Sequence, residues 1–227
     1  MLEFIAVSKQ FPDGQVALDD INLKIEGSDF VFITGPSGAG KSTLLRLITK
    51  ELVPTSGQVM FNEDDIAKIP ANKLHILRRR VGTVFQDFKL LLNRTVFENV
   101  ALSLEVLKRS DSEIEKEVSE ALEKVGILEK ADYFPAQLSG GEVQRTAIAR
   151  AIVSKPEVLL ADEPTGDLDP KTAEQVVELL EKINKEGTTI LMATHNSTIV
   201  NKFKKRVVTL KGGKIEKDQK EGKYESD

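Results

Sequence analysis

One eight-residue run constrains the fold of this chain more than any other segment. It follows the apolar stretch Phe30–Ile33, precedes the apolar-periodic stretch Thr43–Ile48, and consists of Gly35, Pro36, Ser37, Gly38, Ala39, Gly40, Lys41 and Ser42. Glycines allow backbone N–H groups to point inward at phosphate oxygens, and a following helix adds its positive N-terminal end. The pattern predicts a strand, a phosphate-binding loop and a helix, and therefore a chain that binds a nucleoside triphosphate. The alternative is a glycine-rich turn that merely starts a helix.

Three side chains at the end of this loop are predicted to contact the triphosphate or its metal ion. We expect Lys41 to pair with the β- and γ-phosphates, and Ser42 to hold Mg²⁺ through its hydroxyl. We also expect Thr43, the next residue, to bind the nucleotide.

A second apolar run ends in two carboxylates. Residues Val158–Ala161 are continuously apolar, and Asp162 and Glu163 follow them. Such a run is typical of a buried parallel strand whose carboxyl end meets the ligand. We expect Asp162 to support the Mg²⁺ shell, and Glu163, on the opposite side of the extended chain, to polarise an attacking water. Taken alone, the same pair would indicate a solvated turn at a helix start.

Another glycine loop opens a helical pattern that runs to Ile152. Its Ser139 hydroxyl and its exposed N–H groups, with Gly140 and Gly141, form a further anion site. One chain has only one triphosphate loop, so the simplest use of both sites is a head-to-tail, two-fold dimer. In that dimer the second loop caps the γ-phosphate bound by Lys41 of the other copy. The sequence therefore predicts a nucleotide-dependent homodimer with two equivalent sites.

These segments resemble the ATP-binding cassette (ABC) ATPases, because Leu138–Arg145 is similar to that family's signature sequence. The resemblance implies an α/β P-loop NTPase with a RecA-like core, an N-terminal antiparallel β subdomain and an inserted α-helical subdomain. It also implies ATP hydrolysis with ATP and Mg²⁺ as cofactors. Gln86, after the strand-like Val81–Phe85, resembles the family's Q-loop glutamine, which serves catalysis and the metal. Asp167, within Gly166–Asp169, resembles its D-loop aspartate.

Two positions have a structural alternative beside the role that the resemblance implies. His195 follows the apolar Thr188–Thr194, and parallel strand ends would bring it to the same edge as Glu163. The resemblance makes it the switch histidine that contacts the γ-phosphate. Phe11 falls where the family places an aromatic ring that stacks on adenine, although a strand-end phenylalanine is usually a core residue. His75, without such context, is interpreted as a surface or packing residue.

The composition favours one α/β core without a membrane span of its own. The chain has 227 residues, 40% hydrophobic residues and a formal charge of −4. No apolar run approaches the roughly 18 residues needed to cross a bilayer, and no secretory pattern is found at the N-terminus. The absence of cysteine excludes disulfides and Cys-based metal sites. The mild acidity argues against nucleic acid as a partner, and local basic clusters are interpreted as solvated faces.

The patterns along the chain indicate a single domain over residues 1–227. Short alternating strands around the turn Pro12–Gly14 predict an antiparallel sheet, which Gln58–Phe61 completes. A helical subdomain is predicted for about residues 88–135, with Ser112 capping its second helix and Gly126 ending it. After it, strands and helices alternate as in a doubly wound sheet. A last hairpin precedes a loose tail over about residues 218–227.

Four stretches resemble, more specifically, the FtsE family of bacterial cell-division ATPases. They are Phe85–Leu91, Arg94–Ala101, Phe134–Glu142 and Leu191–Asn196. This resemblance implies an FtsX-like membrane protein as partner, a peripheral location on the cytoplasmic face of the cell membrane, and control of peptidoglycan hydrolases. Val143 and Phe11 depart from residues common in relatives, Gln and Tyr respectively, and neither change removes a group that the chemistry requires.

Two other functional classes remain open at this level. An ATPase of a lipoprotein-releasing or macrolide-type exporter carries much the same motifs. A DNA-associated or translation-associated ABC ATPase would carry a long coiled-coil insertion or two cassettes in one chain, and neither pattern is found in this sequence.

An apolar group just after Gln86 is the candidate contact for the membrane partner. It comprises Phe88, Leu90, Leu91 and Leu92. The alternative is that these side chains form the ordinary core of the helical subdomain. The resemblance implies that the partner's cytoplasmic helix binds here, next to a residue that senses the nucleotide.

Overall fold

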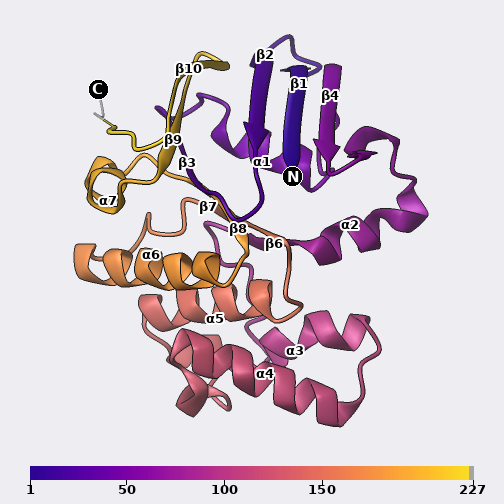
Figure 1. Cartoon of the computed structure of the whole chain (residues 1–227). Coiled ribbons are helices and arrows are strands. Elements are labelled where there is room, and N and C mark those ends of the chain that lie inside the picture. The colour runs from indigo at the N-terminus through magenta and orange to yellow at the C-terminus, as the bar shows by residue number, and fades with distance from the viewer. Residues whose placement is uncertain (225–227) are drawn as a thin grey trace.

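The computed structural model describes residues 1–224, which form two β-sheets and a group of helices below them (Figure 1). The smaller sheet comes from the N-terminal part and has the strand order β2-β1-β4-β5. Its strands are β1 (Leu2–Gln10), β2 (Val16–Ile25), β4 (Ser56–Phe61) and β5 (Asp64–Asp65). All neighbouring pairs are antiparallel. The predicted antiparallel sheet, including the strand at Gln58–Phe61, is confirmed.

The larger sheet is the core of the molecule and has the order β10-β9-β3-β8-β7-β6. Its strands are β3 (Phe30–Thr34), β6 (Val81–Val84), β7 (Val158–Asp162), β8 (Thr189–Ala193), β9 (Arg206–Lys211) and β10 (Lys214–Gln219). All neighbours are parallel except β10, which forms an antiparallel hairpin with β9. Every residue of β3 and β8 is buried, as expected of a sheet covered on both faces.

Alternate residues of the central strands pack into two different hydrophobic cores. Phe30 and Phe32 of β3 face the core that includes the long helices. Val31 and Ile33 face the core shared with the N-terminal sheet. The helices are α1 (Lys41–Ile48), α2 (Leu74–Arg80), α3 (Val96–Val106), α4 (Asp111–Val125), α5 (Gly140–Ile152), α6 (Pro170–Lys185) and α7 (Ser197–Phe203). This arrangement confirms the α/β P-loop fold class.

The helical region lies where the sequence placed its inserted subdomain. Helices α3 and α4 contact each other, and both contact α5. Helix α5 also contacts β6 and α6, and so joins the subdomain to the core. Gly126 ends α4 in the left-handed conformation, with φ 74°, as predicted. Ser112 is not the cap of α4, and that prediction is wrong. Ser110 is the N-cap: its hydroxyl accepts from the Glu113 backbone N–H, and the Glu113 carboxylate accepts from the Ser110 N–H.

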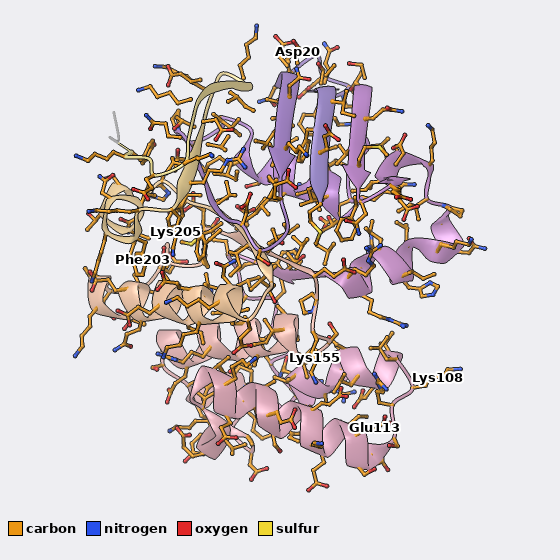
Figure 2. All side chains as sticks on the ribbon, viewed as in Figure 1. Asp20, Lys108, Glu113, Lys155, Phe203 and Lys205 are labelled. Atoms are coloured by element: carbon orange, nitrogen blue, oxygen red, sulfur yellow. The ribbon has the colours of Figure 1, made fainter. Side chains whose placement is uncertain are left out.

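The corrected cap gives a stability prediction with a built-in control. Figure 2 shows Glu113 at the start of α4, with Lys108 in the segment that joins α3 to α4. Ser110→Ala removes both the cap acceptor and a hydrogen bond to Glu113, so we expect a loss of about 1 kcal/mol in the free energy of unfolding. Ser112→Ala should lower the free energy of unfolding by only about a few tenths of a kcal/mol. Urea denaturation of the two variants measures the difference, and a larger loss in Ser112→Ala would contradict the assignment.

The predicted loose tail is also wrong in its first part. Asp218 and Gln219 belong to β10 and pair with Val208 and Val207 of β9. Beyond them, Tyr224 is buried and exchanges two backbone hydrogen bonds with the Asn201 side chain of α7, at 2.8 and 2.9 Å. These contacts form across the sequence, and mixed local charge does not reveal them. Residues 225–227 lie outside the described residues.

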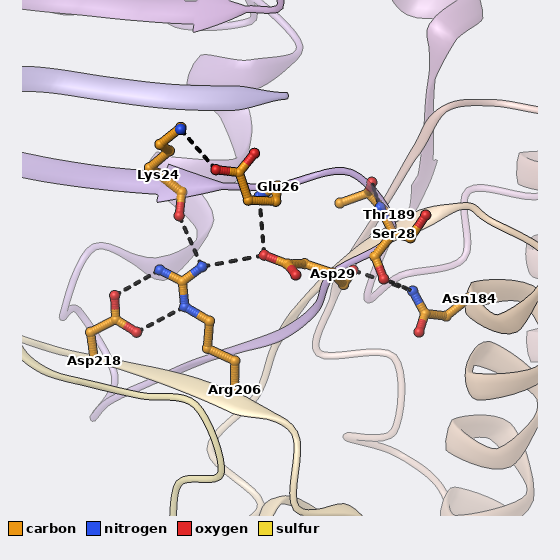
Figure 3. A network of polar contacts seen from close by, with 8 residues as sticks. All are labelled: Lys24, Glu26, Ser28, Asp29, Asn184, Thr189, Arg206 and Asp218. Carbon is orange, nitrogen blue, oxygen red and sulfur yellow. Dashed lines mark hydrogen bonds and ion pairs between the residues drawn. The ribbon is translucent and has the colours of Figure 1, made fainter.

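Arg206 joins the last hairpin to the N-terminal part of the chain (Figure 3). Its guanidinium contacts both carboxylate oxygens of Asp218, at 2.9 and 2.7 Å, and also the Lys24 carbonyl and the Asp29 carboxylate. The hydrogen bond to Asp218 raises the pKa of Arg206 above its ordinary value. The network fixes β9 and β10 beside β3, the strand that leads into the phosphate loop.

Candidate functional site

The glycine loop joins β3 to α1, as the sequence predicts, and its glycines are required by close backbone contacts. A Cβ at Gly35, where φ is 139°, would lie 2.2 Å from the Leu210 carbonyl oxygen of β9. A Cβ at Gly40, where φ is 107°, would lie 2.5 Å from the Ala17 carbonyl oxygen. Gly40 is also the N-cap of α1. The loop is therefore pressed against the sheet with its N–H groups at the start of a helix, a suitable geometry for binding anions.

Lys41 is buried and folded back on its own loop. Its Nζ donates to the carbonyl oxygens of Gly35 and Pro36, at 2.9 and 3.2 Å. The same nitrogen lies 3.6 Å from Oε1 of Glu163. The side chain has only 8% exposure, so its charge is held close to the position where a bound phosphate would lie.

Ser42 and Asp162 meet at the carboxyl end of β7. The Ser42 hydroxyl donates to Oδ1 of Asp162 at 3.0 Å. Burial raises the pKa of Asp162, and the hydrogen bond from Ser42 opposes that shift. A hydroxyl and a carboxylate at this distance offer the hard oxygen ligands that Mg²⁺ prefers, with room left for phosphate oxygens and waters.

Glu163 reaches its position by a backbone turn that sequence periodicity did not predict. We expected an extended residue alternating with Asp162, but Glu163 has φ 47°, in the left-handed region. Its N–H still bonds to the Ala193 carbonyl at 3.0 Å, which keeps it beside β8. The carboxylate contacts Nδ1 of His195 at 3.0 Å with Oε2, while Oε1 faces Lys41. Strain of this kind is typical of functional positions held by their surroundings.

These side chains border one open hollow of about 990 Å³. Its lining includes Pro36, Ser37, Lys41, Gln86, Glu163 and His195. Gln86 also borders a neighbouring hollow, which is lined by Ser42, Asp162 and Asp167 among others. The structure thus gathers the predicted phosphate, metal and water-activating residues around the carboxyl ends of β3, β6, β7 and β8. A buried cation, a carboxylate and an imidazole at one edge can bind a phosphate chain and orient a water against it.

Several predicted residues are not part of this lining: Phe11, the signature residues of α5, and also Gly35, Gly38, Ala39, Gly40 and Thr43 of the phosphate loop and the first turn of α1. Phe11 lies in the turn between β1 and β2, half-buried, with Nζ of Lys9 5.6 Å from the centre of its ring. Ser139, Gly140 and Gly141 lie at the start of α5, and neither hollow includes them. The signature residues therefore belong to the predicted site only if another copy of the chain supplies the rest of it.

The start of α5 is a capped helix end with its own anion-binding character. Ser139 is the N-cap, and its N–H and hydroxyl both donate to Oε2 of Glu142, at 2.8 Å each. A Cβ at Gly141 would lie 2.7 Å from Cγ2 of Thr172 on α6, so close helix packing requires a glycine there.

Sequence reasoning missed the far side of the hollow. Its wall is formed by residues of β9, β10 and the segment after them, including Thr209, Lys211, Lys217 and Tyr224. No short motif marks these residues, because the β9–β10 hairpin reaches the hollow only through sheet pairing. Arg150 of α5 was also missed; it donates to the carbonyls of Phe88 and Lys89, at 2.7 and 2.6 Å, and thereby holds the loop after Gln86.

The apolar group after Gln86 divides into two halves. Phe88 and Leu90 pack against the main core. Leu91 and Leu92 are exposed, with 40% and 73% of their surface accessible. The buried Asn99 side chain bonds to both backbone groups of Leu91, at 2.8 and 3.0 Å. The backbone of this loop is therefore held while the Leu91 side chain faces outward.

Comparisons with known proteins agree with this geometry. Residues 18–166 match the family model described as ABC transporter. The chain is 50% identical over 226 residues to the cell division ATP-binding protein FtsE of Bacillus subtilis, covering 100% of this chain and 99% of that one. It is 48% identical to FtsE of Mycobacterium tuberculosis, with the same coverage. Within residues 1–224, none of the helices has the length and apolar character needed to span a bilayer.

Solved structures show the same fold. A dimeric structure of the ATP-binding cassette MJ0796, in a post-hydrolysis state bound to ADP and Pi, has a TM-score of 0.88 and 37% identity. That comparison covers 99% of this chain and 100% of the other. The cbiO1 protein of Clostridium perfringens, part of the ABC transporter complex cbiONQ, has a TM-score of 0.90 and 34% identity, covering 96% and 88% of the two chains.

Proposed function

The chain belongs to the ABC transporter family of ATPases, and from that premise we propose that it drives a cell-division complex in which an FtsX-like membrane protein is its partner. In this proposal ATP binding closes a homodimer and hydrolysis reopens it. The movement acts through the partner on peptidoglycan hydrolases outside the cell. The chain itself stays on the cytoplasmic face of the membrane and contacts the membrane indirectly.

The convergence of Lys41, Glu163 and His195 around one hollow supports the hydrolytic half of this proposal. Lys41 and the loop N–H groups bind the β- and γ-phosphates. The Glu163 carboxylate, released from Lys41 when phosphate takes its place, accepts a proton from the attacking water. His195 contacts the γ-phosphate, and Gln86 completes the ring around the water and the metal. Phe11 stacks on the adenine ring.

Mg²⁺ fits the oxygen-bearing side chains gathered at the carboxyl end of β7. The Ser42 hydroxyl would hold the ion directly, and Asp162 and Gln86 would support its shell. Bound there, the ion neutralises charge on the phosphates. Asp162, already hydrogen-bonded to Ser42, orients that hydroxyl.

The second half of the active site comes from the other copy in this proposal. Ser139, Gly140 and Gly141 border neither hollow of their own chain, whereas the similar cassette MJ0796 has been solved as a dimer in two structures. A two-fold dimer places the α5 N-terminus of one copy over the γ-phosphate bound by the other, and the D-loop residue Asp167 near the junction. Ser139→Arg is therefore expected to abolish hydrolysis while ATP still binds.

The exposed Leu91 gives a test of the partner surface. Leu91→Glu should prevent association with the membrane protein, because a carboxylate replaces an apolar contact. ATP affinity should stay the same, and the melting temperature should move by no more than about 2 °C, since the side chain is exposed. Co-purification from membranes measures the association. Val106→Glu, at an exposed apolar residue on the far end of α3, is the control and should keep the partner. A Leu91→Glu protein that folds and still co-purifies would exclude this surface.

Purifying the chain from membranes also tests the cell-division role. We expect an FtsX-like protein, with four membrane helices and one modest extracellular domain, to stay bound. A partner with a larger periplasmic domain would instead favour a lipoprotein-releasing or macrolide-type exporter and would overturn the cell-division proposal.

A further inference from the structure

The carboxylate of Glu142 occupies the anion site at the start of α5. Oε2 accepts hydrogen bonds from both the N–H and the hydroxyl of Ser139, at 2.8 Å each. The Ser139 hydroxyl is one of the groups that the proposed dimer assigns to the γ-phosphate bound by the other copy, and the Ser139 N–H completes the capping box with Glu142. The hydrogen bonds from Ser139 hold the pKa of Glu142 below its ordinary value, so the group is ionised at neutral pH. An uncompensated carboxylate here would compete with an incoming phosphate and repel it.

One cation faces this carboxylate from a different part of the chain. Nζ of Lys130 lies 3.5 Å from Oε1 of Glu142, the oxygen that Ser139 does not use. Lys130 ends the short 3₁₀ turn Leu128–Lys130, which follows α4 in the helical subdomain. Its Nζ also lies 4.6 Å from the centre of the Tyr133 ring. Both partners of the ion pair are about a quarter exposed, at 27% and 28%, so water weakens the pair without removing it.

The three residues form a chain from the subdomain to the signature hydroxyl. Lys130 holds one oxygen of Glu142, and Glu142 holds Ser139 with the other. Moving or removing the lysine changes both the charge beside the anion site and the position of the carboxylate that binds the serine. Sequence patterns gave no role to Lys130.

We propose that Lys130 is a positioning residue for ATP hydrolysis: it neutralises and holds Glu142 so that Ser139 can engage the γ-phosphate bound by the other copy. This inference rests on the proposed composite site. Lys130 does not touch the nucleotide, and ATP binding by the Lys41 loop does not depend on it. The competing interpretation is a surface ion pair that only attaches the 3₁₀ turn to α5.

A double-mutant cycle tests whether Lys130 acts on hydrolysis through Glu142, whereas attachment of the turn alone would lower the free energy of unfolding and leave kcat unchanged. Lys130→Met keeps an unbranched side chain but removes the charge and its contact with the Tyr133 ring, and we expect kcat to fall roughly 3- to 10-fold with unchanged ATP affinity. In a Glu142→Gln background there is no charge to neutralise, so adding Lys130→Met should change kcat by less than about 1.5-fold. Lys130→Arg should keep most of the activity. Lys124→Met, which removes the ion pair between Lys124 of α4 and Glu186 at the end of α6, is the control and should behave like the unmutated protein.

Two results would overturn the inference. The first is unchanged kcat in Lys130→Met. The second is an equal loss in the Glu142→Gln background, which would show that Lys130 acts through a contact other than Glu142. Ser139→Arg in the same assay reports on the composite site separately. Loss of hydrolysis in Ser139→Arg with full activity in Lys130→Met would reject the role of Lys130 only, whereas full activity in Ser139→Arg would reject the composite site and this inference with it.

Discussion

Lys41→Ala is expected to weaken ATP binding roughly 10- to 100-fold, because charge-assisted contacts to phosphate are among the strongest that a side chain makes. Nζ of Lys41 now bonds to the Gly35 and Pro36 carbonyls and faces Glu163. A phosphate would replace the carboxylate as its counter-ion, and alanine leaves that phosphate with the loop N–H groups but without the lysine charge. Calorimetric titration with Mg²⁺ and ATP measures the loss.

The control for this variant is Lys24→Ala. Lys24 forms an exposed ion pair with Glu26, at 2.8 Å, away from the loop. Its replacement should leave ATP affinity unchanged, so a loss confined to Lys41→Ala assigns the effect to the phosphate site. Undiminished affinity in Lys41→Ala would place the nucleotide elsewhere.

Glu163→Gln should bind ATP at least as tightly as the unmutated protein and hydrolyse it about 10² to 10⁴ times more slowly. The amide keeps the shape of the side chain but cannot accept a proton from water. It also removes the carboxylate that lies 3.6 Å from Lys41, so phosphate no longer has to displace a counter-ion. Phosphate release in single-turnover and steady-state assays measures the rate, and sizing chromatography with ATP should show a dimer.

The matched control is Glu174→Gln on α6. Its carboxylate pairs with Lys202 at 2.7 Å on the surface, and its loss should leave turnover unchanged. Normal turnover in Glu163→Gln would mean that another group activates the water.

Much of the fold could be predicted from local patterns. The continuous apolar runs at β3, β7 and β8 predict central strands, and in the structure nearly all their residues are buried. The loop between β3 and α1 adds a motif whose spacing is set by phosphate geometry. Together they predict that Lys41, Glu163 and His195 lie at one edge of the sheet.

The remaining features depend on a choice between similar local signals, or on contacts between residues that are far apart in the sequence. Ser110 and Ser112 are both suitable caps, and each is followed three residues later by a glutamate, Glu113 and Glu115 respectively, so the local sequence does not distinguish them. The turn at Glu163 arises because Lys41 and His195 hold its carboxylate, which overrides the alternation of an extended chain. Tyr224 is buried by α7, and its partner lies 23 residues away in the sequence.

The composite site is tested most directly by mixing two inactive variants. Lys41→Ala lacks a working phosphate loop but keeps Ser139, and Ser139→Arg keeps Lys41 and Glu163 but lacks a working signature loop. A mixed dimer holds one complete site, so an equal mixture should recover ATP hydrolysis up to about a quarter of the unmutated rate, as half the dimers are mixed and each has one of two sites. A mixture no more active than the two proteins measured separately would contradict a site shared between two copies.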